Sequence, residues 1–267
     1  MNCKIGPLAL ALAVSLTACQ ASETHVFQHS SNPLPPDPAL QASDLTADQL
    51  IAKSLEARGG DEQLKNIHSV TMTGKWETSD IKSSPITLMI APGRYLRRIE
   101  ARSGGTMFKV VDGQTTWEVT PQTGIAKAKA MVSKDAGRFR RLADPQGPLV
   151  DAQAKGNKVE VLGKMPWENS QVYKLKVTFP DGALNYIYLD AQSFLPVRVV
   201  NTMYVPHVEE DVDLEYIYED YRAVDGVKWP FKERANAPQV KLKQITTWEK
   251  IEVNKPLDEA AFKMPTS

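Results

Sequence analysis

The chain has 267 residues, of which 42% are hydrophobic and 24% are charged. These values are typical of a water-soluble globular protein, and they exclude a disordered chain, a collagen and a multi-span membrane protein. Basic and acidic residues number 32 each, so no overall charge favours nucleic acid as a partner. Cys3 and Cys19 are the only cysteines and both lie near the N-terminus, which excludes a disulfide or a cysteine nucleophile in the body of the chain.

Residues 1–18 have the pattern of an export signal, with Lys4 followed by an apolar run that is too short to span a bilayer. The sequence Leu16-Thr17-Ala18-Cys19 resembles the bacterial lipobox, in which the signal is cut before a cysteine that then receives acyl chains such as palmitate. That resemblance implies a lipoprotein anchored through Cys19. Because Gln20 rather than aspartate follows, it also implies the outer membrane, facing the periplasm. A plain secretory signal that leaves Cys19 as a free thiol is the alternative.

Residues 19–44 are predicted to form a tether that starts at the lipidated Cys19. Four prolines lie between positions 33 and 38, among polar residues without apolar periodicity, which favours an extended linker. His25 and His29 have a spacing that suits a metal on one face of a helix, but nothing nearby would hold the two rings, so a solvated linker is favoured.

The globular domain is predicted over residues 45–267, beginning with a helix. Thr46 and Gln49 form a capping-box pattern, apolar residues recur on one face, and Gly59 and Gly60 end the helix. A short helical turn over 61–67 follows.

From His68 onward, apolar and polar residues alternate, which predicts strands. The expected strands cover residues 68–77, 86–90, 95–100, 107–111, 116–119, 159–162, 172–179, 184–189, 196–203, 212–221, 227–235 and 240–253. Asp-Gly pairs at 112, 181 and 225 predict hairpin turns between several of them. Residues 128–154 lack clean alternation and are predicted to be short helices and loop inserted into the sheet.

These elements predict a mainly β fold of one domain. Connections between the strands are mostly too short for crossover helices, so the sheet is expected to be antiparallel. Many sequential antiparallel strands must protect their edges, which favours a strongly curved sheet or half-open barrel with the N-terminal helix and the helical insertion on its concave side.

Several segments of the domain, in their order along the chain, carry a family resemblance. They are residues 57–64 with 67–69 and Gly74, residues 148–151, residues 189–190 with 195–197, residues 218–230, and residues 254–262 with Pro265. Together they resemble the LolA/LolB-like lipoprotein-sorting superfamily over roughly residues 45–265. The resemblance implies a half-open barrel whose apolar inner face receives acyl chains, helices that act as plug or lid, no cofactor and no catalysis.

An incomplete barrel has more inward positions than its few helices fill, so we expect a cavity for hydrocarbon. Ten adaptable or amphipathic side chains are candidates for its lining. They are Met72, Trp76, Met89, Met107, Trp117, Tyr173, Tyr186, Tyr188, Tyr216 and Tyr218. The alternative is that these side chains fill a closed core.

Two charged clusters have alternative interpretations. Asp211, Asp213 and Glu215 would project to one face of a strand and offer oxygen ligands to calcium, but alternation with apolar residues favours an ordinary solvated face and no metal. Arg97-Arg98 and the arginines at 138–141 would suit lipid headgroups or an acidic partner, although here too a solvated face is favoured.

Catalytic motifs are missing from the sequence: no nucleophile elbow, metalloprotease helix, phosphate loop or dinucleotide fingerprint occurs. We therefore expect a binding protein rather than an enzyme. Its partners would be a lipid or the acyl chains of a lipoprotein, taken up for sorting or transfer. One alternative is a protein-interaction or sensor module on the same scaffold. Another is a hydrolase that uses His68 or His207.

Overall fold

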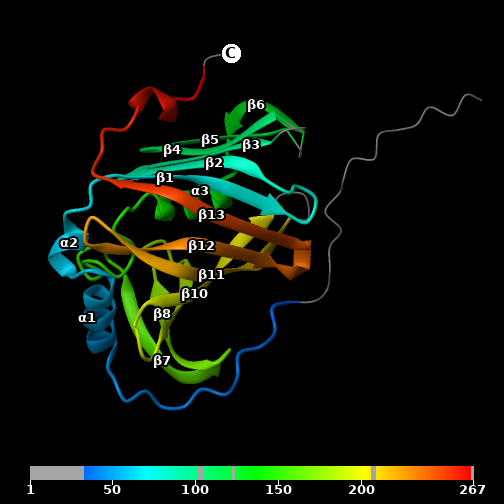
Figure 1. Cartoon of the computed structure of the whole chain (residues 1–267). Coiled ribbons are helices and arrows are strands. Elements are labelled where there is room, and N and C mark those ends of the chain that lie inside the picture. Colours follow the sequence, from blue (N-terminus) through cyan, green and yellow to red (C-terminus); the bar gives the residue numbers. More distant parts are fainter. Residues whose placement is uncertain (1–32, 102–104, 122–123, 206–208, 266–267) are drawn as a thin grey trace, which may run out of the picture.

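A computed structural model describes residues 33–101, 105–121, 124–205 and 209–265. Within these residues, thirteen strands form one antiparallel sheet in the order β6-β5-β4-β3-β2-β1-β13-β12-β11-β10-β9-β8-β7 (Figure 1). Their bounds are β1 Val70–Thr78, β2 Ser84–Ala91, β3 Arg94–Ala101, β4 Gly105–Asp112, β5 Thr115–Thr120, β6 Ile125–Ala130, β7 Lys158–Trp167, β8 Ser170–Thr178, β9 Leu184–Asp190, β10 Pro196–Val205, β11 Glu210–Val224, β12 Val227–Ala237 and β13 Leu242–Val253. The sheet is not closed into a barrel, because β6 and β7 are its two free ends. The mainly β, half-open architecture expected from the sequence is confirmed.

Every neighbouring pair of strands is consecutive in the chain except β1 and β13. The three Asp-Gly pairs lie at the β4–β5, β8–β9 and β11–β12 turns, as predicted. At the last of these, Asp225 and Gly226 have φ of 49° and 80°, the left-handed geometry of a two-residue hairpin turn. Strand β6 was not expected, because in its sequence IAKAKA only small alanines alternate with lysine and Ile125 is the one large apolar residue.

The concave face of the sheet carries the main apolar core and three helices, α1 (Ala47–Arg58), α2 (Asp61–Lys65) and α3 (Ser133–Leu142). Helix α1 has the predicted capping box between Thr46 and Gln49, and Gly59 ends it with a φ of 135°. Helix α3 contacts β3 and β4 on one side and β10 on the other, so it crosses the space inside the curve. No helix in the described ranges is long and apolar enough to cross a membrane.

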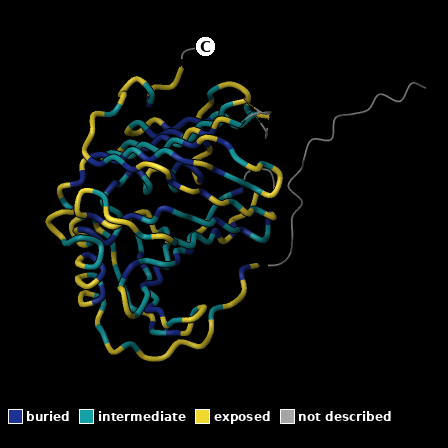
Figure 2. Tube along the Cα trace, viewed as in Figure 1, coloured by how far each residue is buried: buried dark blue, intermediate teal, exposed yellow. Residues whose placement is uncertain are grey.

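Two terminal segments cover parts of the convex face. Near the C-terminus, Phe262 is fully buried against Leu96, Val110 and Trp117 of β3–β5. Near the N-terminus, Leu34 is buried against Met165 and other side chains of β7–β10. Both faces of the sheet are therefore partly covered. For this reason, few strands show strict alternation of buried positions, dark blue in Figure 2, with exposed ones.

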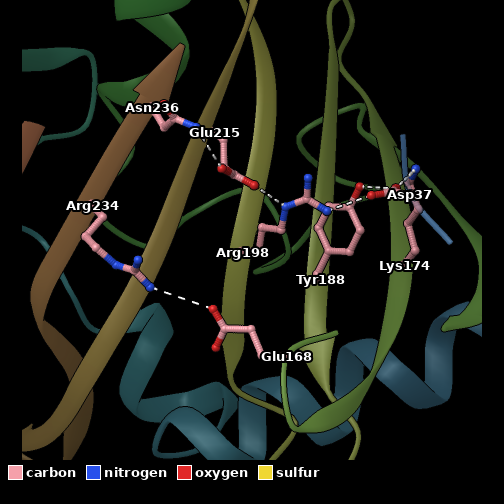
Figure 3. Close-up of polar contacts among 8 residues, drawn as sticks. All are labelled: Asp37, Glu168, Lys174, Tyr188, Arg198, Glu215, Arg234 and Asn236. Atoms are coloured by element: carbon pink, nitrogen blue, oxygen red, sulfur yellow. Dashed lines mark hydrogen bonds and ion pairs between the residues drawn. The ribbon is translucent and has the colours of Figure 1, made fainter. Parts of the chain in front are cut away.

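Residues 33–44, the N-terminal segment, carry a carboxylate, Asp37, that binds three side chains of the sheet. Asp37 accepts hydrogen bonds from Lys174 Nζ at 2.6 Å, the Tyr188 hydroxyl at 2.6 Å and Arg198 Nη1 at 2.7 Å (Figure 3). Arg198 also donates to Glu215 Oε1 at 2.6 Å. This part of the predicted Pro-rich tether therefore packs on the sheet instead of forming a free linker.

The N-terminal segment also pairs with the edge strand β7. Gln41 and Lys164 exchange two backbone hydrogen bonds of 2.8 and 2.9 Å. The adjacent Gly163 makes this approach possible, because a Cβ atom there would lie 2.5 Å from the carbonyl oxygen of Gln41. Residues 1–32, with the predicted signal, Cys19, His25 and His29, lie outside the described residues.

Candidate functional site

A cavity of about 330 Å³ lies between the concave face of the sheet and the elements that cover it. Helix α1, Leu142 at the end of α3 and the Pro148-Leu149 turn form its cover. The floor is largely aliphatic and aromatic, and its members come from β1, β2, β9 and β13. Examples are Met72, Ile86, Leu88, Ile187 and Trp248. A cavity of this size lies at the small end of the range seen for small-molecule sites.

A polar row crosses the floor of the cavity at one level of the sheet. Tyr218 of β11 is paired with Glu233 of β12, and Glu233 is paired with Thr246 of β13. All three side chains line the cavity, as do Gln244 and Arg97. Arg97 Nη2 donates to Gln244 Oε1 at 3.3 Å, so the arginine reaches over β2 and β1 toward β13. The cavity is thus apolar with one localised polar wall.

Glu233 is an ionisable group within an apolar setting. Burial raises its pKa to about 7, although the positive charge of Arg97 acts in the opposite direction. Within the described part of the chain, no hydrogen bond or ion pair reaches its carboxyl group. Near neutral pH, Glu233 therefore exists in both protonation states.

Two arginines line the cavity without a carboxylate partner in the described ranges. Arg58 donates to the carbonyl oxygen of Gln146 at 3.3 Å, and its guanidinium lies 5.8 Å from the ring centre of Trp229. Burial lowers the pKa of Arg58, since its charge is poorly compensated. Arg97 lies over the ring of Trp76 at 6.0 Å. The cavity wall therefore carries an excess of positive charge.

Helix α3 is held on the sheet by buried charges and one aromatic contact. Lys109 Nζ lies 3.1 Å from Asp135 Oδ2 and also contacts Glu118, and the side chains of both carboxylates are 7% exposed. Phe139 packs on Tyr95 with ring centres 5.4 Å apart. Residues 128–154, predicted to be an insertion of short helices and loop, thus contain the last three residues of β6, the whole of α3 and the Pro148-Leu149 turn that covers the cavity.

Three of the ten side chains predicted to line a cavity do so: Met72, Tyr216 and Tyr218. The rings of Tyr216 and Tyr218 are nearly parallel, with centres 6.4 Å apart. Trp76, Met107 and Tyr173 pack in or against the same concave core but away from the cavity. The Tyr173 hydroxyl donates to Asp44 Oδ1 at 2.8 Å.

The other four candidates lie on the convex face. Met89 and Trp117 pack beneath the C-terminal segment, where the Trp117 indole donates to the carbonyl oxygen of Phe262 at 2.9 Å. Tyr186 and Tyr188 pack beneath the N-terminal segment. Alternation along a strand separates two faces but does not identify the concave one, and here both faces are covered.

Sequence reasoning assigned no site role to Glu233 or Arg58, and it favoured a solvated face for Arg97. The signal for Arg97 is its pairing partner: Arg97 faces Leu88, and Leu88 faces Met72, a predicted lining residue. The same signal marks Glu233, because it faces Tyr218, another predicted lining residue, although its alternation along β12 is that of a solvent-facing glutamate.

The acidic cluster of Asp211, Asp213 and Glu215, considered for calcium, does not lie at the cavity. Asp211 pairs with Lys134 at 3.2 Å, and Glu215 pairs with Arg198. Across the described ranges, no group of three histidine, cysteine or acidic side chains is placed to hold a metal ion. His68 is exposed, and His207 lies outside the described residues.

Comparison with known proteins identifies the fold but no sequence family. No family model matches the chain, and no curated protein sequence does. Many solved structures match, among them three with TM-scores above 0.5. A DUF1329 family protein from Desulfovibrio piger has a TM-score of 0.54 and 9% identity, and the match covers 81% of this chain and 97% of that one.

Of the other two structures, one is named for lipoprotein sorting and one as a LolA superfamily protein. A putative outer membrane lipoprotein-sorting protein domain from Vibrio parahaemolyticus has a TM-score of 0.53 and 11% identity, over 81% of this chain and 97% of that one. A LolA superfamily protein from Nitrosomonas europaea has a TM-score of 0.51 and 12% identity, over 82% and 98%. The fold of this chain is therefore LolA-like, as the sequence resemblance implied.

Proposed function

We propose that this protein binds the acyl chains of a lipid or lipoprotein in the cavity, for sorting or transfer within the bacterial envelope. The observation that carries the proposal is the apolar cavity beneath a cover formed by α1, α3 and the Pro148-Leu149 turn. Each methylene buried there contributes about 0.8 kcal/mol, so ten would contribute about 8 kcal/mol before the costs of association. Two neighbours of the same fold are named for lipoprotein sorting or as LolA superfamily members, which supports this class of ligand.

Transfer by this route needs no covalent step and no cofactor. The driving force is removal of hydrocarbon from water, and entry requires displacement of the cover. Met72, Tyr216 and Tyr218 are the predicted ligand contacts that we retain. A protein-interaction or sensor module on the same scaffold is the second candidate, but no described feature favours it over the cavity.

Location is part of the proposal. Acylation of Cys19 would anchor the domain to a membrane, and the motif Leu16-Thr17-Ala18-Cys19 supports it. Two or three acyl chains anchor a protein durably, whereas one does so only marginally. The intact mass of the N-terminal peptide tests this, since an unmodified Cys19 in protein from its native membrane would rule out the anchor.

A cavity-filling substitution tests the binding function. Leu88→Trp places a larger side chain in the cavity, and we expect it to weaken binding of a fluorescent stearoyl probe by about tenfold or more, because the chain loses buried area. Thr87→Trp is the matched control, since Thr87 is adjacent on β2 and faces the convex side. Equal binding by wild type and Leu88→Trp, with both proteins folded, would contradict acyl binding in this cavity.

A further inference from the structure

The cavity has an uncompensated positive charge where its wall is polar. Arg97 lines the cavity, and among the described residues its one hydrogen-bond partner is the neutral amide of Gln244 at 3.3 Å. Arg97 is half-buried in this apolar wall, and a guanidinium that is partly withdrawn from water without an anion favours binding of a negatively charged group. Arg58, the second arginine of the wall, adds to the same potential.

The groups around Arg97 indicate which anion would complete the site. Glu233 lies close enough for the Arg97 charge to act on it, and Tyr95 and Tyr216 are close enough for both charges to act on them. Burial raises the pKa of both tyrosines, so they stay neutral. With Glu233 protonated, the site offers one guanidinium and one acid proton. The charge of Arg97 matches the single charge of a carboxylate, and the acid proton of Glu233 can be donated to one of its oxygens.

The volume limits the hydrophobic part of the ligand. The cavity of about 330 Å³ is at the small end of the range for small-molecule sites, which suits one acyl chain better than the three chains of a mature lipoprotein. The polar row lies on β11–β13, and the aliphatic floor continues over β1 and β2. A carboxylate at the row therefore leaves the attached chain against apolar side chains.

We propose that the cavity binds a single-chain fatty acid, with its carboxylate on Arg97 and Glu233 and its chain along the floor near Met72, Leu88 and Ile187. This inference rests on the proposed acyl-binding function and names the ligand class. Glu233 in its acid form donates to the carboxylate, and Arg97 supplies the charge.

The assignment is tested by measuring the affinity of the full-length wild-type protein for four probes at pH 6.5. The probes are palmitate, hexadecanol, hexadecyl phosphate and a synthetic triacylated lipopeptide. We expect palmitate to bind about tenfold or more tightly than hexadecanol, because a charge-assisted hydrogen bond is stronger than a neutral one. Arg97→Gln should remove that preference and leave the hexadecanol affinity within about twofold of wild type.

Two further variants separate charge from folding. Arg97→Lys keeps the charge and should retain most of the preference. Arg98→Gln is the matched control, because Arg98 is the next residue on β3, is exposed and pairs with Glu100 at 2.8 Å. It should bind all probes as wild type does.

The outcomes separate this inference from the function on which it rests. Equal affinity for palmitate and hexadecanol, or an undiminished preference in Arg97→Gln, would overturn the carboxylate site and leave acyl binding in place. Tighter binding of hexadecyl phosphate or of the lipopeptide would overturn the ligand class. No binding of any acyl probe would contradict the proposed function as well.

Discussion

At the scale of single residues, Glu233 determines how the stability of the protein depends on pH. Its pKa is about 7 in the folded protein and near 4.5 in an exposed chain, so the folded state holds the proton more tightly. Stability is therefore highest below pH 4.5 as far as this group is concerned, falls as pH rises toward 7, and stays lower above it. Glu233→Gln imitates the protonated form. At pH 8.5 we expect it to raise the free energy of unfolding by about 2 kcal/mol, measured by urea denaturation.

The same comparison at pH 5.5 should show a smaller difference, because most wild-type molecules then carry the proton. Glu249→Gln is the control, since Glu249 is 54% exposed and pairs with Lys75 on the solvated side of the sheet. A variant that is no more stable than wild type at pH 8.5 would show that water in the cavity already solvates the carboxylate.

The cavity-lining residues that could be predicted from the sequence are those whose side-chain chemistry suits an enclosed apolar position. Met72, Tyr216 and Tyr218 are large and amphipathic or apolar, so alternation was enough to select them. Arg97 and Glu233 are charged, and charge on a strand ordinarily indicates solvent. Only their pairing across neighbouring strands with predicted lining residues indicates that their face is enclosed.

At the scale of elements, helix α3 is the part of the cavity's cover whose contacts with the sheet are most clearly defined. Asp135 lies in its first turn and contacts Lys109 of β4 at 3.1 Å and Arg138 at 3.5 Å. The helix has no side-chain cap at Val132, so this carboxylate also supplies the favourable charge at the N-terminus. Asp135→Asn leaves Lys109 with Glu118 alone. We expect faster amide exchange over residues 136–142 and a several-fold faster release of a bound stearoyl probe.

The control for this substitution is Asp48→Asn, which removes an exposed first-turn aspartate from α1 and therefore reproduces the loss of helix-terminal charge alone. Exchange and probe release in Asp135→Asn no faster than in this control would show that Phe139 and its apolar neighbours hold α3 without the ionic contacts.

Patterns of residues close in sequence predicted most helices and strands. They did not predict how helices α1 and α3 and the Pro148-Leu149 turn are arranged over the cavity. The capping box at Thr46 and the Asp-Gly turns depend on residues close in sequence, and the structure has them as expected. Strand β6 escaped detection because an edge strand needs no alternating pattern when little covers it. The passage of α3 from β4 to β10 depends on sheet curvature, which no local pattern encodes.

At the scale of the whole molecule, the curvature has to be produced by the sheet itself, because β6 and β7 do not close on one another. Irregularities interrupt four of the strand pairings, including those at Thr73/Gly74 and Val161/Gly163. Such bulges bend and twist a strand locally. Hairpin turns predicted the sequential order of strands, but the pairing of β1 with β13 joins the two halves of the chain and could not be read from any turn.

The N-terminal segment connects this domain to its proposed anchor. Because Leu34 and Asp37 are docked on the sheet, the chain from Cys19 to Pro33 spans at most about 50 Å, less than the whole 19–44 segment would allow. The anchored domain would then stay within that distance of the membrane. The docking depends on Asp37, where burial alone would raise the pKa but hydrogen bonds from Lys174, Tyr188 and Arg198 lower it below its usual value of 3.8.

Asp37→Asn removes the charge that holds the N-terminal segment and leaves Lys174 without an anion at 2.6 Å. We expect the free energy of unfolding at pH 7 to fall by about 1–3 kcal/mol. Amide protection at Gln41 and Lys164 should fall with it, because these residues bond to each other only while the segment is docked. The difference in unfolding free energy from wild type should be complete above pH 4. It should shrink as pH falls through the lowered pKa of Asp37, where wild type also loses the charge.

Asp80→Asn, in an exposed turn, controls for the substitution itself. Unchanged protection at Gln41 in Asp37→Asn would mean that Leu34 and the β7 pairing are sufficient to dock the segment, and the distance limit would then not depend on this carboxylate.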